Sequence, residues 1–407
     1  MSIIADTDME LSKIEEKAKH QYKEVVEIRR HLHQHPELSY QEFETTEFII
    51  EKLEELGIAV DRPLETGCVG IIEGGKASDR VVALRADIDA LPILEVGDHK
   101  KDFISQKAGI AHCCGHDSHT ANLLGVAKVL SQLKEEIEGT VLLIFQPGEE
   151  KLPGGGRLLC ETGYLQKKGV DVIYGLHSNP NLAPGKIAIR KGPMMARPDE
   201  FNIEIFGQGG HAAYPHKAVD PIVMAAEVVS QLQTIVSRSI NPTDPAVVTV
   251  GKIMGGSAHN IIPEKVDLIG TVRTFSSENA DLIKDRIEKI VKGVTEAHGG
   301  RYTYDFDYGY PAVINTDWAT DLVIDAANDV LGEGNVELMD DPIMAGEDFA
   351  FYQQHFPGVF FFLGSGSEKA GSTYTWHHPK YNIDEDCFKT GIALMTSLVF
   401  QAIPENV

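Results

Sequence analysis

The stretch VVALRAD (81–87) decides the fold class, because it is an apolar run that ends in an aspartate. Three later apolar runs are likewise followed by polar or glycine-rich residues: TVLLIFQP (140–147), VDVIYGLH (170–177) and VFFFLGSG (359–366). Runs of this kind are typical of strands that are buried on both faces, as in a parallel sheet. A helical pattern at 118–136 separates the first two runs, so the sequence predicts an α/β domain with a mainly parallel sheet between helices.

The region 197–309 has a different pattern. EFNIEIFG (200–207) alternates between apolar and polar residues, and Asp220 followed by Pro221 is typical of a helix start. Two strand patterns, a helix closed by Gly299 and Gly300, and the alternating RYTYDFDYG (301–309) follow. The order β-α-β-β-α-β predicts an inserted ferredoxin-like α+β domain. We therefore expect a larger α/β domain over 1–194 and 310–407, with a small α+β domain inserted at 195–309.

The composition narrows the class of function. The 407 residues carry a formal net charge of -24, which disfavours binding to nucleic acid or to anionic membranes. No apolar run approaches the length of a membrane span, and the first residues do not resemble a secretion signal. Five cysteines make a disulfide framework improbable, so the expected compartment is the reducing cytoplasm.

Ligand-type side chains follow each of the four apolar runs. The set comprises Asp87 and Asp89, then Glu149 and Glu150, then His177, and finally His377 and His378. AHCCGHDSHT (111–120) adds histidines and cysteines just before a helix. In an open α/β sheet, catalytic groups collect at the carboxyl ends of the strands. Each cluster alone has a structural explanation, but their convergence predicts a metal site.

The residue types indicate metal-assisted hydrolysis. Cys and His suit zinc, and carboxylates also admit manganese, cobalt or nickel. Neighbouring side chains in extended backbone point apart, so Glu149 and Glu150 are expected to divide the work of proton transfer and metal binding. A non-catalytic binding protein and a cysteine-nucleophile hydrolase that uses Cys113 or Cys114 are the alternatives from other classes.

With these motifs in place, the chain resembles the metal-dependent aminoacylase and carboxypeptidase family. The resemblance is to its branch of hippurate hydrolases, N-acyl-amino-acid amidohydrolases and auxin-conjugate hydrolases. It extends over nearly the whole chain, and the motifs that carry it are RRHLHQHPELSYQE (29–42), RADIDALPI (85–93), AHCCGHDSHTA (111–121), FQPGEE (145–150), GLHSNP (175–180), GQGGHAAYPHKAVDPI (207–222), NIIP (260–263), GTVRTF (270–275), MAGEDFAFY (344–352) and TWHHPKYNIDE (375–385).

The resemblance implies a site with two divalent metal ions. Zinc or manganese is expected first, and cobalt or nickel second. Glu149 would be the base that activates a water between the metals. Asp89 and Asp117 would orient the ligands, whereas His112 and His119 would only build the helix start. The implied metal ligands are Cys114, His116, Glu150, His177 and His377.

The resemblance also implies that the α/β domain over 1–194 and 310–407 is catalytic and that the inserted domain over 195–309 is a lid or dimerisation domain. His211 would stabilise the oxyanion of the reaction, commonly in the active site of a neighbouring subunit. Asn260 and Arg273 would help to hold the substrate, with the paired donors of Arg273 on a carboxylate. A homodimer or homotetramer through the lid is therefore expected.

The expected activity is hydrolysis of the amide bond in N-acyl amino acids of the hippurate or N-acetyl type. A metallo-dipeptidase or carboxypeptidase with the same centre remains the alternative. One departure from the family pattern is Cys113, which replaces a small residue before Cys114. It would be inert packing or an oxidation-prone neighbour of the ligand, and the strain of vicinal disulfides favours the inert interpretation.

Overall fold

The computed structural model describes residues 2–404, which form two compact units. Unit 1 comprises Met1–Met194, Ile314–Asp341 and Asp348–Val407, and unit 2 comprises Met195–Val313 and Pro342–Glu347. The short return of Pro342–Glu347 to unit 2 has no signal in the sequence. The chain passes between the units at β7 (Gly192–Met195) and β14 (Val313–Asn315), which pair with each other.

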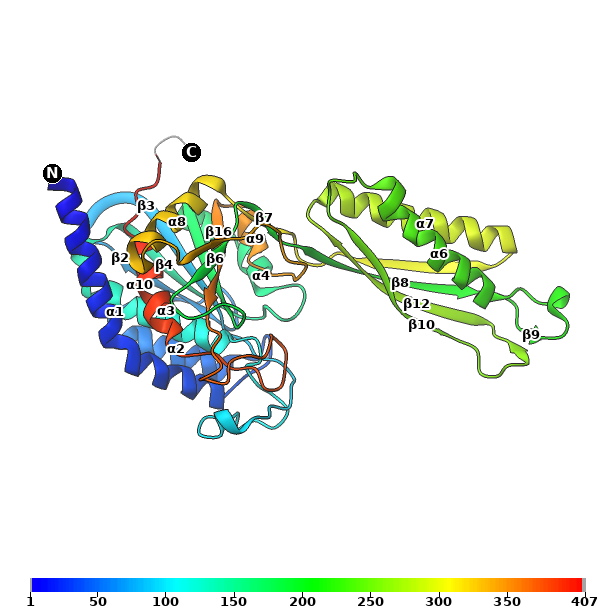
Figure 1. The fold of residues 1–407 in the computed structure, drawn as a ribbon, viewed down its shortest axis with the longest axis horizontal. Helices are drawn as coiled ribbons and strands as arrows, with labels where there is room; N and C mark the ends of the chain where they lie inside the picture. The colour runs from blue at the N-terminus through cyan, green and yellow to red at the C-terminus, as the bar shows by residue number, and fades with distance from the viewer. Residues whose placement is uncertain (1, 405–407) are drawn as a thin grey trace. The chain divides into compact units, whose positions relative to one another are not determined.

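Unit 1 is built on one eight-stranded sheet with the order β1-β2-β4-β3-β5-β16-β6-β15. Its four central strands, β4, β3, β5 and β16, are mutually parallel, whereas β1, β2 and β6 join it in antiparallel pairs. The strands are β1 (Ala59–Asp61), β2 (Cys68–Glu73), β3 (Lys76–Asp87), β4 (Glu138–Gln146), β5 (Val172–Asn179), β6 (Ile187–Ile189), β15 (Val336–Leu338) and β16 (Gly358–Gly364). The predicted mainly parallel sheet is confirmed (Figure 1).

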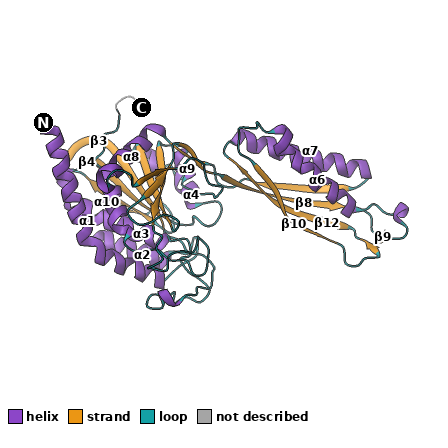
Figure 2. Cartoon of the chain, viewed as in Figure 1, coloured by secondary structure: helices purple, strands orange, loops and turns teal. Residues whose placement is uncertain are grey.

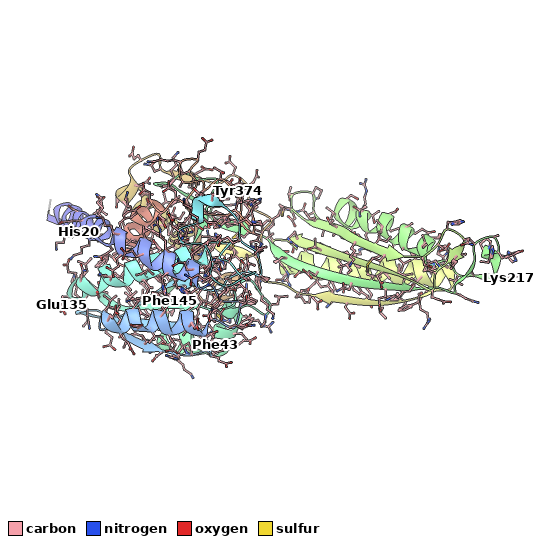
Figure 3. The ribbon with its side chains drawn as sticks, turned by 90° about the horizontal axis from the view of Figure 1, so that it is seen from below. His20, Phe43, Glu135, Phe145, Lys217 and Tyr374 are labelled. Carbon is pink, nitrogen blue, oxygen red and sulfur yellow. The ribbon has the colours of Figure 1, made fainter. Side chains whose placement is uncertain are left out.

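Both faces of the central strands are buried, as their apolar sequences predict. On β3, Val82 and Leu84 face the main hydrophobic core, while Ala83 and Arg85 are equally buried on the opposite face. Phe145, near the end of β4, is enclosed within unit 1 (Figure 3). Burial of this kind stabilises the layered arrangement by about 25 cal/mol for each Å² of apolar surface that is removed from water.

The helices of unit 1 cover the sheet. Five of them, α1, α2, α3, α8 and α10, form a single hydrophobic core with one face of the sheet. The short helices α4 and α9 pack on each other. Their bounds are α1 (Ser2–Gln34), α2 (Phe43–Glu55), α3 (His116–Gln132), α4 (Gly155–Glu161), α5 (Tyr164–Lys168), α8 (Asp317–Leu331), α9 (Ala350–Gln353) and α10 (Cys387–Leu398).

Unit 2 is a four-stranded antiparallel sheet with two helices on one face (Figure 2). Its strand order, β10-β12-β8-β13, places the first strand between the third and the fourth, which is the predicted ferredoxin-like topology. Its elements are β8 (Arg197–Phe206), β9 (Gly210–His211), α6 (Pro221–Ser239), β10 (Val247–Gly255), β11 (Ile261–Ile262), β12 (Lys265–Thr274), α7 (Ser277–His298) and β13 (Arg301–Asp307). The predicted cap is present, since the Asp220 side chain accepts the Ile222 N–H.

No helix within residues 2–404 combines the length and the apolar character that crossing a bilayer requires.

Candidate metal centre

The four parallel strands at the centre of unit 1 bring the sequence clusters together. β4, β3, β5 and β16 are neighbours in the sheet and run in the same direction, so their carboxyl ends meet at one edge. Asp87 ends β3, Glu149 and Glu150 follow β4, His177 lies near the end of β5, and His377 follows β16. The N-terminus of α3 adds Cys114 and His116 to this edge.

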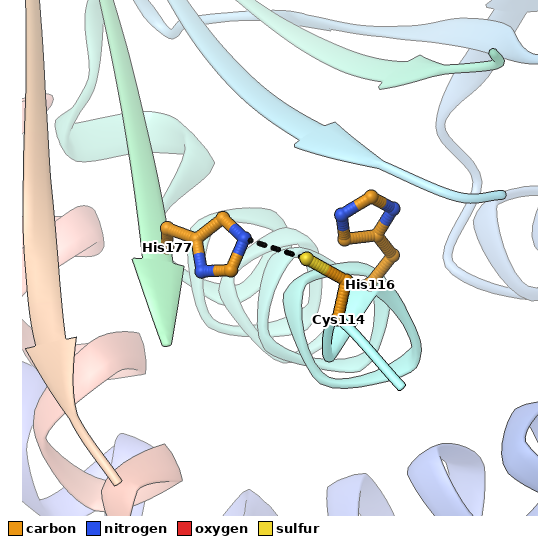
Figure 4. A group of neighbouring side chains, drawn as sticks. All are labelled: Cys114, His116 and His177. Carbon is orange, nitrogen blue, oxygen red and sulfur yellow. Dashed lines mark hydrogen bonds between the residues drawn. The ribbon is translucent and has the colours of Figure 1, made fainter. Parts of the chain in front are cut away.

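Three buried side chains form the inner part of the site. The thiol of Cys114 lies 3.3 Å from Nε2 of His177, and His116 stands on the other side of that thiol (Figure 4). Ligand atoms of Cys114, His116 and His177 all lie within 4.8 Å of one another. This spacing suits three ligands of one divalent ion.

Two carboxylates and one histidine form the outer part. Cys114, Glu150 and His377 make a second group within 4.8 Å, and His116, Glu149 and Glu150 make a third. The backbone at 149–150 bends and is not extended, so both carboxylates converge, contrary to the expectation that they point apart. The structure thus brings the predicted base and all five predicted metal ligands into one cluster.

Hydrogen bonds orient the two inner histidines. Nδ1 of His116 donates to Asp89 at 3.1 Å, which turns Nε2 into the site. Nδ1 of His177 donates to the backbone oxygen of Ser178 at 2.9 Å, and that oxygen also accepts the indole N–H of Trp376 at 2.8 Å. Such outer contacts fix the tautomer and the aim of a ligating histidine.

The negative charges around the cluster favour a bound cation. Burial, together with the charges of Glu150 and Glu149, raises the pKa of the Cys114 thiol well above its usual range. Burial lowers the pKa of His116, but the negative charges of Asp87, Asp89 and Glu150 outweigh it and raise that pKa to about 10. Divalent ions would compensate these carboxylates and favour the thiolate and the neutral imidazole.

Two buried polar atoms without a hydrogen bond indicate whether metal ions fit the cluster. Nε2 of His116 and Oε1 of Glu150 are both buried without a hydrogen bond among the described residues, and the Glu150 oxygen lies 3.3 Å from Nε2 of His377, itself a candidate ligand. Buried polar atoms are rarely left unpaired, because desolvation is costly. Both atoms point into the cluster that includes Cys114, and nitrogen, oxygen and sulfur donors in this arrangement suit zinc or a similar ion.

His377 is held in an uncommon backbone conformation. Its φ is 64°, in the left-handed region that residues other than glycine seldom adopt. Its N–H donates to the backbone oxygen of Cys113 at 2.8 Å, and its Nε2 lies 3.3 Å from Oε1 of Glu150. Conformations of this kind cluster at functional sites, where the surrounding structure enforces them.

Two further histidines of AHCCGHDSHT, His112 and His119, are buried next to this cluster or to its helix start. His119 Nδ1 donates to Asp87 at 2.6 Å and its Nε2 accepts the Ser178 N–H at 2.9 Å, so both ring nitrogens are used. His112 is buried, and its ring nitrogens have no hydrogen-bond partner among the described residues. Hydrogen bonds to Asp87 and Ser178 account for both ring nitrogens of His119, whereas no hydrogen bond assigns a role to His112, and the expectation that both histidines build the helix start stays a prediction.

Asp117 lies elsewhere than predicted. Its carboxylate accepts from Nε of Arg29 at 2.8 Å and from Nδ1 of His33 at 2.7 Å, and neither of these is a predicted ligand. Asp117 therefore ties α3 to α1, whereas Asp89 alone makes the ligand contact that was expected of both. The helix turn explains the difference, because adjacent helical residues face different directions.

Three predicted lid residues lie at opposite ends of the unit 2 sheet. His211 pairs with Ile261, and Asn260 accepts the Ala212 N–H through its backbone oxygen. Both residues lie beyond the Phe206 end of β8, where Figure 3 marks Lys217. Arg273 is opposite Pro198, at the other end of the same strand. Eight residues of β12 separate the ends, which corresponds to about 25 Å.

The local contacts define what these side chains offer. Nδ1 of His211 accepts the Ala213 N–H at 3.1 Å, so the ring proton lies on the exposed Nε2. Arg273 donates through Nε to the backbone oxygen of Met344 and through Nη1 to Thr271. Its Nη2 is the nitrogen that has no partner within the part of the chain that the structure describes.

Several residues around the site were not singled out from the sequence. The bend between α1 and α2 supplies Ser39, Tyr40 and Glu42, which bond to Asp89 and to the turn that carries Glu149. On the opposite side, Arg85 bonds both Asp87 and Asp348. The motifs HPELSYQE and MAGEDFAFY contained these residues, but spacing along the chain does not reveal contacts between distant segments.

Comparison with known proteins gives consistent matches over most of the chain. A model of peptidase family M20/M25/M40 matches residues 83–401. An N-acyl-L-amino acid amidohydrolase of Geobacillus stearothermophilus is 47% identical over 295 residues, covering 72% of this chain and 78% of its own length. A thermostable carboxypeptidase of Saccharolobus solfataricus is 38% identical over 92% of this chain and 95% of its own length. A solved Bacillus subtilis structure, described as a dinuclear metal-binding peptidase of the M20 family, has a TM-score of 0.80 at 35% identity and covers 94% of this chain and 98% of its own.

Proposed function

The chain belongs to peptidase family M20/M25/M40 and is a hydrolase of amide bonds, and on that premise we propose that it cleaves N-acyl amino acids with a dinuclear metal centre. The observation that carries the proposal is the single cluster of five buried or half-buried residues and the exposed His377 at the carboxyl ends of β3, β4, β5 and β16. The amidohydrolase relative supports the substrate class.

We assign the two ions to the two groups that share Cys114. Cys114, His116 and His177 would hold one ion, and Cys114, Glu150 and His377 would hold the other. Thiolate, imidazole and carboxylate groups of this kind are the ligands of catalytic zinc sites. When bound, the ions would lower the pKa of a water and polarise the substrate carbonyl.

We assign both proton transfers of the hydrolysis to Glu149. It is buried, and one of its oxygens lies within 4.8 Å of ligand atoms of His116 and Glu150. From this position it takes the proton of the attacking water and returns it to the leaving amine. A carboxylate beside the candidate metal ligands is placed to reach a water held there, as a general base must.

A pair of neighbouring substitutions tests this division of labour. Glu149→Gln should lower kcat by at least about 100-fold, the range of general-base catalysis, while the protein still binds two ions. Glu150→Gln should reduce the bound metal itself, as measured by elemental analysis after dialysis. Near-normal turnover in Glu149→Gln would refute the mechanism, and unchanged metal content in Glu150→Gln would refute the ligand assignment.

The second candidate is a carboxypeptidase or dipeptidase, which the carboxypeptidase relative favours. The same metal centre would serve, since an acylated amino acid and a peptide present the same amide. A panel of N-acetyl, N-benzoyl and dipeptide substrates, run with added zinc, manganese, cobalt or nickel, separates the two. Higher kcat/KM on dipeptides than on N-acyl amino acids would replace the first proposal by the second.

We further propose that His211 and Asn260 act in the active site of a partner subunit. The two ends of the unit 2 sheet are about 25 Å apart, too far for one small substrate to contact both His211 and Arg273 of the same subunit. The Nε2–H of His211 is suited to an oxyanion, and Arg273 to the substrate carboxylate. The edge strand β10 exposes Ile253 and Met254, which suits a homodimer or homotetramer through this unit.

Subunit complementation tests the partner assignment. His211→Ala and Glu149→Gln are each expected to be inactive, but co-expressed chains should form mixed dimers with one intact site. Random pairing predicts about a quarter of the wild-type rate, since half of the dimers are mixed and each has one active site of two. Absence of any recovery, with mixed dimers verified by mass, would place His211 in its own subunit.

The reducing cytoplasm is the proposed compartment. All five cysteines are buried and free of disulfides, as expected for a chain that folds without oxidation.

A further inference from the structure

The bend between α1 and α2 contacts the turn that carries Glu149. The hydroxyl of Tyr40 donates to the backbone oxygen of Lys151 at 2.6 Å and accepts the Gly154 N–H at 2.9 Å. Its ring packs on Gly148, where an added Cβ would lie 2.2 Å from a ring carbon. Tyr40 itself has a φ of 66°, so its backbone is held in a left-handed conformation to make these contacts.

Glu42 is fully buried and forms a hydrogen bond with the same turn. Its Oε1 accepts the Gly148 N–H at 2.8 Å, and its Oε2 accepts the hydroxyl of Thr66 at 2.9 Å. Its side chain is 0% exposed, and burying a carboxyl is costly unless its oxygens are bonded. Both oxygens of Glu42 are bonded, and one bond ends on the residue that precedes Glu149.

Ser39 connects the bend to the metal ligands. Its hydroxyl donates to Oδ2 of Asp89 at 2.7 Å. The same carboxylate accepts the backbone N–H of Glu150 at 3.0 Å and, through Oδ1, Nδ1 of His116. The bend therefore reaches both the turn that carries the base and the carboxylate that orients one histidine.

We infer that Ser39, Tyr40 and Glu42 are positioning residues that fix where the Glu149 carboxylate stands relative to the metal ligands. The inference rests on the proposed role of Glu149 as base. Gly148 has a φ of 64° and its backbone is intrinsically flexible, so the turn depends on outside contacts for its position. A base displaced by about 1 Å can cost on the order of 100-fold in rate.

Three variants and one control test the inference on the metal-loaded enzyme. Tyr40→Phe removes both hydroxyl bonds and keeps the ring, and Glu42→Ala removes the bond to Gly148. Glu42→Gln retains an oxygen for the Gly148 N–H and should restore activity. Burial, with the charge of Asp89, raises the pKa of Glu42 to about 7, so the neutral amide is a close substitute. Tyr164→Phe is the control, because its hydroxyl bonds Asp61 outside the turn.

The expected result is a loss in kcat alone. Tyr40→Phe and Glu42→Ala should lower kcat about 10-fold or more, with KM and the two bound ions unchanged, because only the transition state needs the placed base. Glu42→Gln and Tyr164→Phe should stay within about twofold of wild type. If Glu42→Ala fails to fold, Tyr40→Phe alone carries the test.

Two results would overturn the inference. One is a kcat within twofold of wild type for Tyr40→Phe; the other is a loss of rate that follows lost metal, which makes the bend a support of the ligands only. The proposed function is tested separately, because an active Glu149→Gln variant refutes the base itself. An inactive Glu149→Gln variant beside a fully active Tyr40→Phe variant refutes only the positioning role.

Discussion

Gly115 offers a quantitative test of how tightly the ligand segment is built. It lies between Cys114 and His116 at the start of α3 with a φ of 96°. A Cβ there would lie 2.6 Å from both Oγ of Ser178 and Oη of Tyr381. These two oxygens are buried and bonded to each other at 2.8 Å, so neither can move away without breaking a buried hydrogen bond.

The cost of Gly115→Ala has two parts. Placing a residue other than glycine in the left-handed region costs about 1–2 kcal/mol. Overpacking a tight buried site adds about 1–3 kcal/mol. We expect the free energy of unfolding to fall by about 2–5 kcal/mol in total. Metal affinity should fall as well, because ligands flank the substituted residue on both sides.

Gly163→Ala is the matched control for the first part. Gly163 has a φ of 68° and nothing within 4 Å of an added Cβ, so it carries the conformational cost without the clash. Thermal unfolding of chelator-treated protein should show a larger loss for Gly115→Ala than for Gly163→Ala. Equal losses in the two variants would refute the steric argument, and undiminished metal binding by Gly115→Ala would refute its link to the ligands.

Four further outcomes are expected. A chelator should abolish turnover and added zinc or manganese should restore it, whereas a thiol alkylator should leave the metal-loaded enzyme active because Cys113 and Cys114 are buried; the reverse pattern would favour a cysteine nucleophile. Burial opposes ionisation of Glu95, but its hydrogen bond to His33 and the charges of His33 and Lys100 lower its pKa from 4.5 to about 2. Its folded-state pKa is below the unfolded value, so ionised Glu95 contributes about 3 kcal/mol to the free energy of unfolding above pH 4.5, and this contribution is lost as the pH falls toward 2. Glu95→Gln should flatten the dependence of the free energy of unfolding on pH in that window. The same pH dependence in the variant and the wild type would contradict this. Trp376→Phe removes the indole N–H bond to the Ser178 oxygen and keeps an aromatic, though smaller, side chain, so metal affinity measured by chelator competition should fall about 10-fold, and unchanged affinity would contradict this. Cys113→Ala should retain metal and activity, and a large loss of either would show that its thiol is needed.

The sheet and the metal cluster were predictable because they depend on local patterns. VVALRAD and the three similar runs are apolar on both faces, and parallel strands place their carboxyl ends at one edge. Ligand-type residues that follow such runs lie at that edge, and they meet because β4, β3, β5 and β16 are neighbours in the sheet. Cys114 and His116 joined the cluster because the helix start at α3 lies at the same edge.

Contacts between distant segments were not predictable. Glu42 and Gly148 are 106 residues apart, and no periodicity in either segment indicates that they bond. Asp117 stands next to His116, yet the helix turns its carboxylate toward Arg29, 88 residues earlier. The edge strands β1 and β15 have three residues each, too few for a strand pattern to be distinguished from a loop.

Cys113 shows how a position can matter through its backbone alone. Its thiol is 0% exposed, and burial raises its pKa to about 12, so it is a poor nucleophile and a poor target for oxidants. Its backbone oxygen, however, accepts the N–H of His377, which holds that ligand in its left-handed conformation. That bond needs only a small buried side chain at position 113. The inert interpretation of the thiol and a structural role for the backbone of this residue are therefore compatible.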